Sequence, residues 1–223
     1  MEAIVEICVA GETLQARGDK TLFWPAASTL FVADLHLGKG AAFRAGGLPV
    51  PTGSTAATLD ALSQAALATQ AEHVIVLGDL WHAKEGRTEE NQAALAVWRE
   101  TRPEIQLSLV IGNHDRRSGW ELPATEPGRL LGPFALHHHP EPNPAGYVLC
   151  GHLHPGVQLS GIARQALRLP CFWFGQEVAV LPAFGDLTGT MTIARNPGDR
   201  VVVVADRQVA LLPHRDRSGV RRR

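Results

Sequence analysis

Four short apolar runs in this sequence end in residues that commonly bind metals, and this pattern constrains the fold more than any other feature. Runs of this length, rich in Val, Ile and Leu, are typical of buried parallel strands. Because such strands end along one edge of a sheet, the sequence predicts a single metal centre at that edge. The runs are residues 30–33, 73–77, 107–111 and 147–150, and they lead into Asp34 and His36, Asp79, Asn113 and His114, and His152 and His154, respectively.

The residue types at these strand ends point to divalent metals. Carboxylate, imidazole and amide oxygen together suit Mn, Fe or Zn. Asp79 stands alone at its strand end and is well placed to bridge two ions, and Gly78 before it leaves room for another group to approach the backbone. Asp34 and His36 are two residues apart, so on an extended segment both can point the same way, and His152 repeats this spacing with His154.

The charge of such a centre favours an anionic substrate. Two divalent ions bring more positive charge than Asp34 and Asp79 cancel, so we expect a phosphate to bind there. A two-metal centre can clamp the attacking and leaving oxygens of an in-line displacement and can lower the pKa of a bound water to about 7.

Composition bounds the class of protein. The chain has 223 residues, 45% of them hydrophobic, and a net charge of -1, which excludes nucleic-acid binding by bulk charge and leaves only a local basic groove. Cys8, Cys150 and Cys171 are an odd number without close spacing, which predicts reduced, buried thiols. No apolar stretch reaches the roughly 20 residues of a membrane helix. We expect a cytoplasmic protein without a membrane partner, with one domain over residues 1–214 and a disordered basic tail over 215–223.

The order of elements predicts an α/β fold. Strands are expected at residues 3–10 and 21–24, with a hairpin between them, and helices from Ser54 or Thr55 to 70 and from Thr88 to before Pro103. Their alternation with the apolar runs predicts parallel strands with helical crossovers. Residues 38–53, rich in Gly and Pro, predict a long ordered loop, and residues 116–132 an irregular segment. Short strands at 134–136 and 147–150 and antiparallel strands within 167–212 would complete a second sheet.

The ligand segments together resemble the ordered signature of the calcineurin-like metallophosphoesterases. The resemblance covers about residues 30–155 and implies an α/β fold, a four-layer α/β/β/α sandwich with the metals at the carboxyl edge of the strands. The blocks that carry it are Asp34-x-His36, Gly78-Asp79, Gly112-Asn113-His114-Asp115, His138 and Gly151-His152-x-His154.

The segments between these blocks resemble one branch of that family, the bacterial ligase-associated DNA-damage-response endonucleases. This resemblance implies a DNA substrate, with a DNA ligase and a helicase of the same repair system as partners. The similar segments are residues 33–39, 43–44, 47–53, 78–82, 151–156 and 181–185.

The resemblance also implies roles for individual residues. Asp34, His36, Asp79 and His154 would hold one metal, and Asp79, Asn113, His138 and His152 the other. His114 would be the non-ligand catalytic histidine beside Asp79 and Asn113, able to protonate the leaving oxygen or stabilise phosphoryl charge. Lys39, Arg44 and His82 would contact phosphates, although both loop cations fit a solvated loop equally well.

One ligand position is left open by the sequence. The run His137-His138-His139 offers three histidines for a single place; the branch pattern points to His138, leaves His139 as the alternative and makes His137 a bystander.

These expectations combine into a hydrolase with two divalent ions, Mn first and Fe or Zn also suitable. It would hydrolyse nucleic-acid phosphodiester bonds by metal-activated water attack, as a DNA endonuclease in repair. Two other functions stay open: a phosphodiesterase or pyrophosphatase for small nucleotides, and a non-catalytic scaffold.

Overall fold

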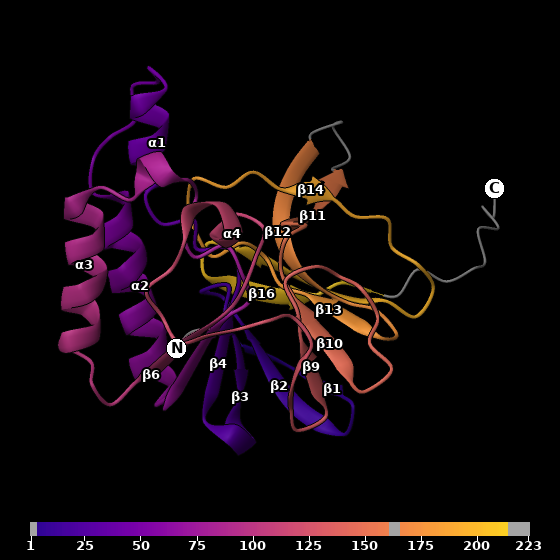
Figure 1. The fold of residues 1–223 in the computed structure, drawn as a ribbon. Coiled ribbons are helices and arrows are strands. Elements are labelled where there is room, and N and C mark those ends of the chain that lie inside the picture. Colours follow the sequence, from indigo (N-terminus) through magenta and orange to yellow (C-terminus); the bar gives the residue numbers. More distant parts are fainter. Residues whose placement is uncertain (1–3, 161–165, 214–223) are drawn as a thin grey trace.

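Two sheets packed face to face form the centre of the molecule (Figure 1). The computed structural model describes residues 4–160 and 166–213. The first sheet has the order β1-β2-β3-β4-β5-β6-β7. Its strands are β1 (Ile4–Val9), β2 (Glu12–Arg17), β3 (Leu22–Trp24), β4 (Thr29–Val32), β5 (His73–Val76), β6 (Gln106–Val110) and β7 (Ala124–Thr125).

The second sheet has the order β14-β11-β12-β13-β10-β9-β8, and β15 joins it beside β12 and carries β16. Its strands are β8 (Arg129–Leu131), β9 (Phe134–Leu136), β10 (Tyr147–Cys150), β11 (Pro155–Ser160), β12 (Ala166–Phe174), β13 (Val178–Val180), β14 (Met191–Thr192), β15 (Arg200–Ala205) and β16 (Gln208–Leu211).

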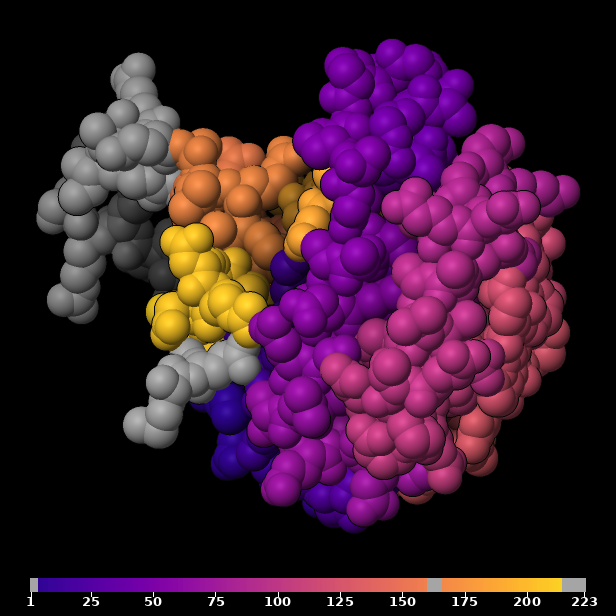
Figure 2. All heavy atoms as spheres, turned by 90° about the vertical axis from the view of Figure 1, so that its left-hand side faces the viewer, coloured from indigo at the N-terminus to yellow at the C-terminus, as the bar shows by residue number. Residues whose placement is uncertain are grey.

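The helices lie on the side of the first sheet. Figure 2 looks onto α2 (Ser54–Thr69) and α3 (Glu89–Glu100), and the segment of α1 (Lys39–Ala45) projects above them. A short helix, α4 (Asp115–Ser118), follows β6, and two 3-10 turns, η1 (Pro25–Ala27) and η2 (Lys84–Gly86), complete the set. No helix in the described ranges is long and apolar enough to span a membrane.

The predicted crossovers are confirmed. Strands β4 to β7 pair in parallel, with α2 between β4 and β5 and α3 between β5 and β6. Strands β1 to β4 form an antiparallel meander, which contains the predicted hairpin and extends it to β4. Parallel neighbours need such long connections, and these bring the carboxyl ends of β4, β5 and β6 to one edge.

The first sheet separates two cores. On its outer face, Leu59 and Leu62 of α2 and Trp98 of α3 pack on the strands, and the Trp98 indole donates hydrogen bonds to the Leu59 carbonyl oxygen and to the Ser63 hydroxyl. On its inner face, Phe31 packs in one cluster with residues of the second sheet. Burial on both faces explains why β4, β5 and β6 read as continuous apolar runs.

The expected α/β sandwich is confirmed, with one difference in its outer layer. After α4 the described residues form strands and loops, so no α-helix within them covers the outer face of the second sheet. Trp173 and Ile193 pack against that face instead. The apolar runs beyond residue 155 are short and broken by Gly and Pro, so they pair as strands and leave no amphipathic helix for a fourth layer.

Several local predictions need correction. Residues 39–45 of the predicted loop form α1, and the segment 116–132, predicted to be irregular, contains α4, β7 and β8. Thr88 caps α3 as predicted, whereas α2 starts after Gly53 without a side-chain cap. The second sheet is mixed, because β10 pairs in parallel with both β9 and β13.

Two further predictions concern the thiols and the chain ends. Cys150 and Cys171 are buried as expected, but Cys8 is exposed on β1, because the outer strand faces solvent on one side. The single domain over residues 1–214 stays a prediction, and the basic tail 215–223 lies outside the described residues.

Candidate metal centre

Side chains from five segments converge at the carboxyl edge of β4, β5 and β6. Ligand atoms of Asp34, His36 and His154 lie within 4.8 Å of one another, and so do those of Asp34, Asp79 and His138. Asp34 is shared by the two groups, whereas Asp79, the acid expected to bridge two ions, belongs to the second group. Its carbonyl oxygen accepts a hydrogen bond from the His36 backbone N–H of the first group. The two groups correspond to the two predicted ion positions.

The His138 imidazole lies among the other candidate ligands. Its Nδ1 donates to the Leu77 carbonyl oxygen at 3.0 Å, which turns Nε2 into the cluster. There Nε2 lies 2.9 Å from Asn113 Oδ1, 3.2 Å from His152 Nδ1 and 3.4 Å from Asp79 Oδ2. Asn113 and His152 therefore join the second group as predicted.

The two neighbouring histidines lie differently. His137 turns away, with its Nε2 3.0 Å from Asn143 Nδ2, which fits its prediction as a bystander. The His139 ring rests against His152, with 4.0 Å between centroids. His139 also forms a group of candidate ligand atoms with His138 and His152. The sequence analysis offered His139 as an alternative to His138 and not as a ligand beside it.

A glycine in front of each of three ligand segments gives another ligand room. A Cβ on Gly78 would lie 2.0 Å from His138 Nδ1, one on Gly112 would lie 2.3 Å from Asp79 Oδ1, and one on Gly151 would lie 2.5 Å from Asp34 Oδ2. The close approach expected at Gly78 is confirmed, and the His138 imidazole is the group that makes it. The three segments therefore fit one another only while these positions lack a side chain.

The backbone of the ligands is left-handed at five positions. Asp34, His36, Asp79, His152 and His154 have φ angles between 46° and 70°. The extended segment that was expected to align Asp34 with His36 is therefore wrong, although both side chains do converge. The backbone N–H groups of these two residues donate to the carbonyl oxygens of Gly78 and Asp79, which holds the turn. Non-glycine residues in this region cost about 1–3 kcal/mol each and concentrate at functional sites.

Asp115 ties together the turns that carry Asp79 and Gly112, a role that the sequence analysis did not predict for it. Its fully buried carboxylate accepts hydrogen bonds from the backbone N–H groups of Gly112, Asp79 and Leu80 at 2.8–2.9 Å. Burial raises the pKa of Asp115, and the Asp79 charge adds to this, whereas these hydrogen bonds lower it. The turns after β5 and β6 are thus tied to one side chain.

The residues present fit divalent cations. Asp34 Oδ1 and His36 Nδ1 are buried and have no hydrogen-bond partner within the described chain. Burial works to raise the pKa of Asp79, but the hydrogen bond and charge of His138 lower it to about 2, so this carboxylate is ionised at neutral pH. Unpartnered oxygen and nitrogen donors beside a buried carboxylate suit Mn, Fe or Zn.

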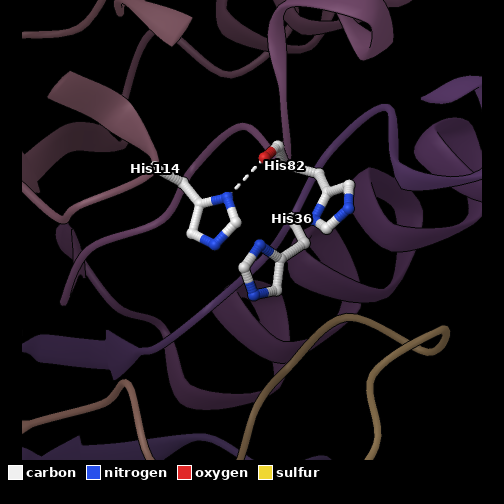
Figure 3. A group of neighbouring side chains, drawn as sticks. All are labelled: His36, His82 and His114. Carbon is white, nitrogen blue, oxygen red and sulfur yellow. Dashed lines mark hydrogen bonds between the residues drawn. The ribbon is translucent and has the colours of Figure 1, made fainter. Parts of the chain in front are cut away.

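A second group of imidazoles lies on the solvent side of the centre, where His36, His82 and His114 meet (Figure 3). The His82 and His114 rings stack with 5.3 Å between centroids. His114 Nδ1 makes a short hydrogen bond to the His82 carbonyl oxygen, and its Nε2 lies 3.9 Å from Asp79 Oδ2. Burial lowers the pKa of His82 to about 4, helped by the Lys39 charge, so His82 is neutral at pH 7.

The two predicted loop cations behave differently. Burial lowers the pKa of Lys39, and the Asp34 and Asp79 carboxylates oppose this, so the amine lies within electrostatic reach of the centre. The Arg44 guanidinium instead donates to the carbonyl oxygens of Val50 and Pro51 at 3.2 and 2.9 Å. The structure therefore brings Lys39 to the centre but uses Arg44 within its own loop.

The comparison with known proteins agrees with this arrangement. The calcineurin-like phosphoesterase family model matches residues 27–156, which hold every predicted ligand. The chain is similar to a Pseudomonas putida nuclease, MPE, whose crystal structure aligns with a TM-score of 0.79 at 35% identity, over 90% of this chain and 96% of that chain. A phosphoesterase from E. coli, Yfce, aligns with a TM-score of 0.42 at 16% identity, over 82% and 97% of the two chains. No curated protein sequence matches.

Proposed function

The chain belongs to the calcineurin-like phosphoesterase family, and from that premise we propose that this metal-dependent phosphoesterase cleaves the phosphodiester bonds of DNA. The observation that carries the proposal is the pair of ligand groups sharing buried Asp34. The similarity to a nuclease over nearly the whole length of both chains supports a nucleic-acid substrate.

The ligand groups suggest how two ions would be held. Asp34, His36 and His154, with Asp79 as a shared acid, would hold one ion. Asp79, Asn113, His138 and His152 would hold the other. Bound divalent ions supply Lewis-acid stabilisation of charge on the phosphoryl oxygens. The mixed carboxylate, imidazole and amide set favours Mn, with Fe and Zn also suitable.

His114 is the proposed proton donor. Its Nδ1 is held by the His82 carbonyl oxygen, which fixes the ring orientation. Its Nε2 lies 3.9 Å from the Asp79 carboxylate, so a doubly protonated ring could give the Nε2 proton to the leaving oxygen. Lys39 and neutral His82 would contact the phosphate outside the ligand groups. A role for Arg44 in that contact stays a prediction.

The test is a nuclease assay on defined single- and double-stranded oligonucleotides with Mn, run beside bis-p-nitrophenyl phosphate and elemental analysis. We expect two ions per chain and cleavage of DNA. Turnover of the small diester or of nucleotides without DNA cleavage would reject the DNA substrate and favour the small-nucleotide alternative. Absence of any turnover by metal-loaded protein would favour a scaffold.

A variant pair tests the role of His114. His114→Ala should keep its metal content and lose about 100-fold or more of the DNA cleavage rate, the size of a general-acid contribution. His137→Ala is the matched control, because His137 faces Asn143, and it should cleave normally. Equal rates for the two variants would reject the proton-donor role. Work in DNA repair with a ligase and a helicase stays a prediction.

A further inference from the structure

A second site of a different kind lies at the opposite end of the parallel strands. A cavity of about 680 Å³ is lined there by Thr29, His73 and Gln106, the first residues of β4, β5 and β6. Five residues separate Thr29 from Asp34, which is about 16 Å along a strand that rises about 3.3 Å per residue. The cavity is therefore separate from the metal centre.

The cavity gathers cations without acids. Arg99 of α3, Arg102 in the loop after it and Arg129 of β8 line it beside His73, and no carboxylate is among its lining residues. Within the described chain none of the three arginines forms an ion pair with an acid.

The hydrogen bonds of these arginines leave donors free. Arg99 Nη1 reaches the Glu121 carbonyl oxygen at 3.4 Å, and Arg102 Nη1 reaches the Thr101 carbonyl oxygen at 3.0 Å. Arg102 Nε is buried and has no acceptor among the described residues. A buried N–H of a charged group without an acceptor costs free energy that a bound anion can recover.

The remaining walls are apolar. Ile75 and Leu131, from one apolar cluster, and Ile105 and Leu107, from the other, also line the cavity. The volume lies within the range of about 300–1,000 Å³ that is usual for small-ligand sites, which combine apolar walls with a few polar anchors. The arginine side chains would bind an anionic group, and the apolar walls would bind an apolar body on the same ligand.

We propose that this cavity binds a small organic anion, whose carboxylate or phosphate is held by Arg99, Arg102 and Arg129 and whose apolar body lies against Ile75 and Leu131, which belong to the same apolar cluster. The proposal is independent of the metal centre and of the reaction that occurs there.

The test uses two fluorescent probes with nearly the same body. 8-Anilino-1-naphthalenesulfonate carries a negative charge, and N-phenyl-1-naphthylamine does not. We expect the anionic probe to bind one site per chain of the metal-loaded protein. Arg102→Gln should weaken that probe about tenfold, the effect of one charge-assisted hydrogen bond, and should leave the neutral probe unchanged.

Three controls make the outcome decisive. Arg168→Gln, at an exposed arginine on β12, should leave both probes unchanged. Arg129→Gln, at an exposed position, should weaken the anionic probe about threefold and decides the matter if Arg102→Gln fails to fold. Asp79→Asn should not affect binding, since loss there would assign the probe to the metal centre and overturn the proposal.

Displacement identifies the head group. Phenylphosphonate and benzoate carry the two candidate anions on the same ring, and whichever displaces the probe at lower concentration names the preferred one. Equal affinity of the anionic probe for the parent, Arg102→Gln and Arg129→Gln proteins would overturn the proposal, as would equal loss of the neutral probe.

Discussion

At the scale of single residues, the metal centre depends on three glycines as much as on the candidate ligands themselves. Gly78, Gly112 and Gly151 each leave the space that a ligand from another segment fills. The strand-end pattern was sufficient to predict which residues converge. It could not predict the left-handed backbone of Asp34 or His36, because that conformation is held by hydrogen bonds to the segment after β5 and not by local preference.

Gly78→Ala should remove metal from the site that includes His138. Both Gly78 and Gly47 have left-handed backbones, with φ of +88° and +85°, so an alanine at either costs about 1–2 kcal/mol. Only at Gly78 would the new Cβ overlap an imidazole, whereas Gly47 has nothing within 4 Å. We expect Gly78→Ala to bind fewer ions and lose at least about 100-fold activity, and Gly47→Ala to retain both. Elemental analysis and a diester assay measure this, and a fully loaded Gly78→Ala protein would contradict it.

The thiols should react at one position only. Cys8 is exposed, while Cys150 and Cys171 are buried. Burial raises the pKa of Cys171 to about 12, so almost none of it is thiolate at pH 8. Ellman's reagent at pH 8 should therefore titrate one thiol in the native protein and three after unfolding in guanidinium chloride. Rapid reaction of two or more native thiols would contradict this packing, and Cys8→Ser should abolish the native signal.

At the scale of elements, α1 and the segment after it form the most prominent projection beside the metal centre (Figure 2). Helices α2 and α3 were predictable from apolar spacing and from Thr88, but α1 was not. It is short, it starts after Gly38 with a left-handed φ of 75°, and its sequence is rich in Gly and Ala. Tertiary contacts with η2, where Gly38 and Gly86 pack backbone to backbone, hold it in place.

Arg44→Ala should loosen the segment after α1 without changing metal content. The Arg44 guanidinium holds the carbonyl oxygens of Val50 and Pro51, so its loss removes a side-chain anchor from this Gly- and Pro-rich loop. We expect amide hydrogen exchange across residues 46–53 to rise at least about tenfold, since both hydrogen bonds of this charged group are lost. If exchange stays unchanged while the KM for DNA rises, the side chain contacts substrate instead. Lys39→Ala is the contrasting variant, expected to raise KM and leave loop exchange unaltered.

At the scale of the whole molecule, the metal centre joins the two sheets at one edge. Asp34 and Asp79 follow strands of the first sheet, whereas His138, His152 and His154 follow strands of the second. The sequence predicted both the parallel first sheet and a second sheet. The pairing of short strands across long distances, such as β10 with β13, depends on packing that no local pattern records, and so the mixed second sheet and its uncovered outer face were not foreseen.

Removal of metal should therefore lower the melting temperature. An ion present at 100 times its Kd stabilises the folded state by about 2.7 kcal/mol, which corresponds to about 5–10 °C in a chain of this size. A chelator should produce this loss, measured by calorimetry, and Mn should restore it. Thr88→Ala is the control, because loss of the α3 cap costs about 1 kcal/mol with or without metal. A melting temperature indifferent to chelation would mean that the ions do not link the sheets.

The glycine beside each ligand also limits how the centre can be redesigned. Lengthening Asp79 to glutamate, in order to favour a different ion, would press the carboxylate against the Gly112 backbone, where there is no smaller amino acid to substitute. The same obstacle meets any longer acid at position 34 beside Gly151. At these two positions a longer acid therefore needs a matching shift of the neighbouring glycine loop.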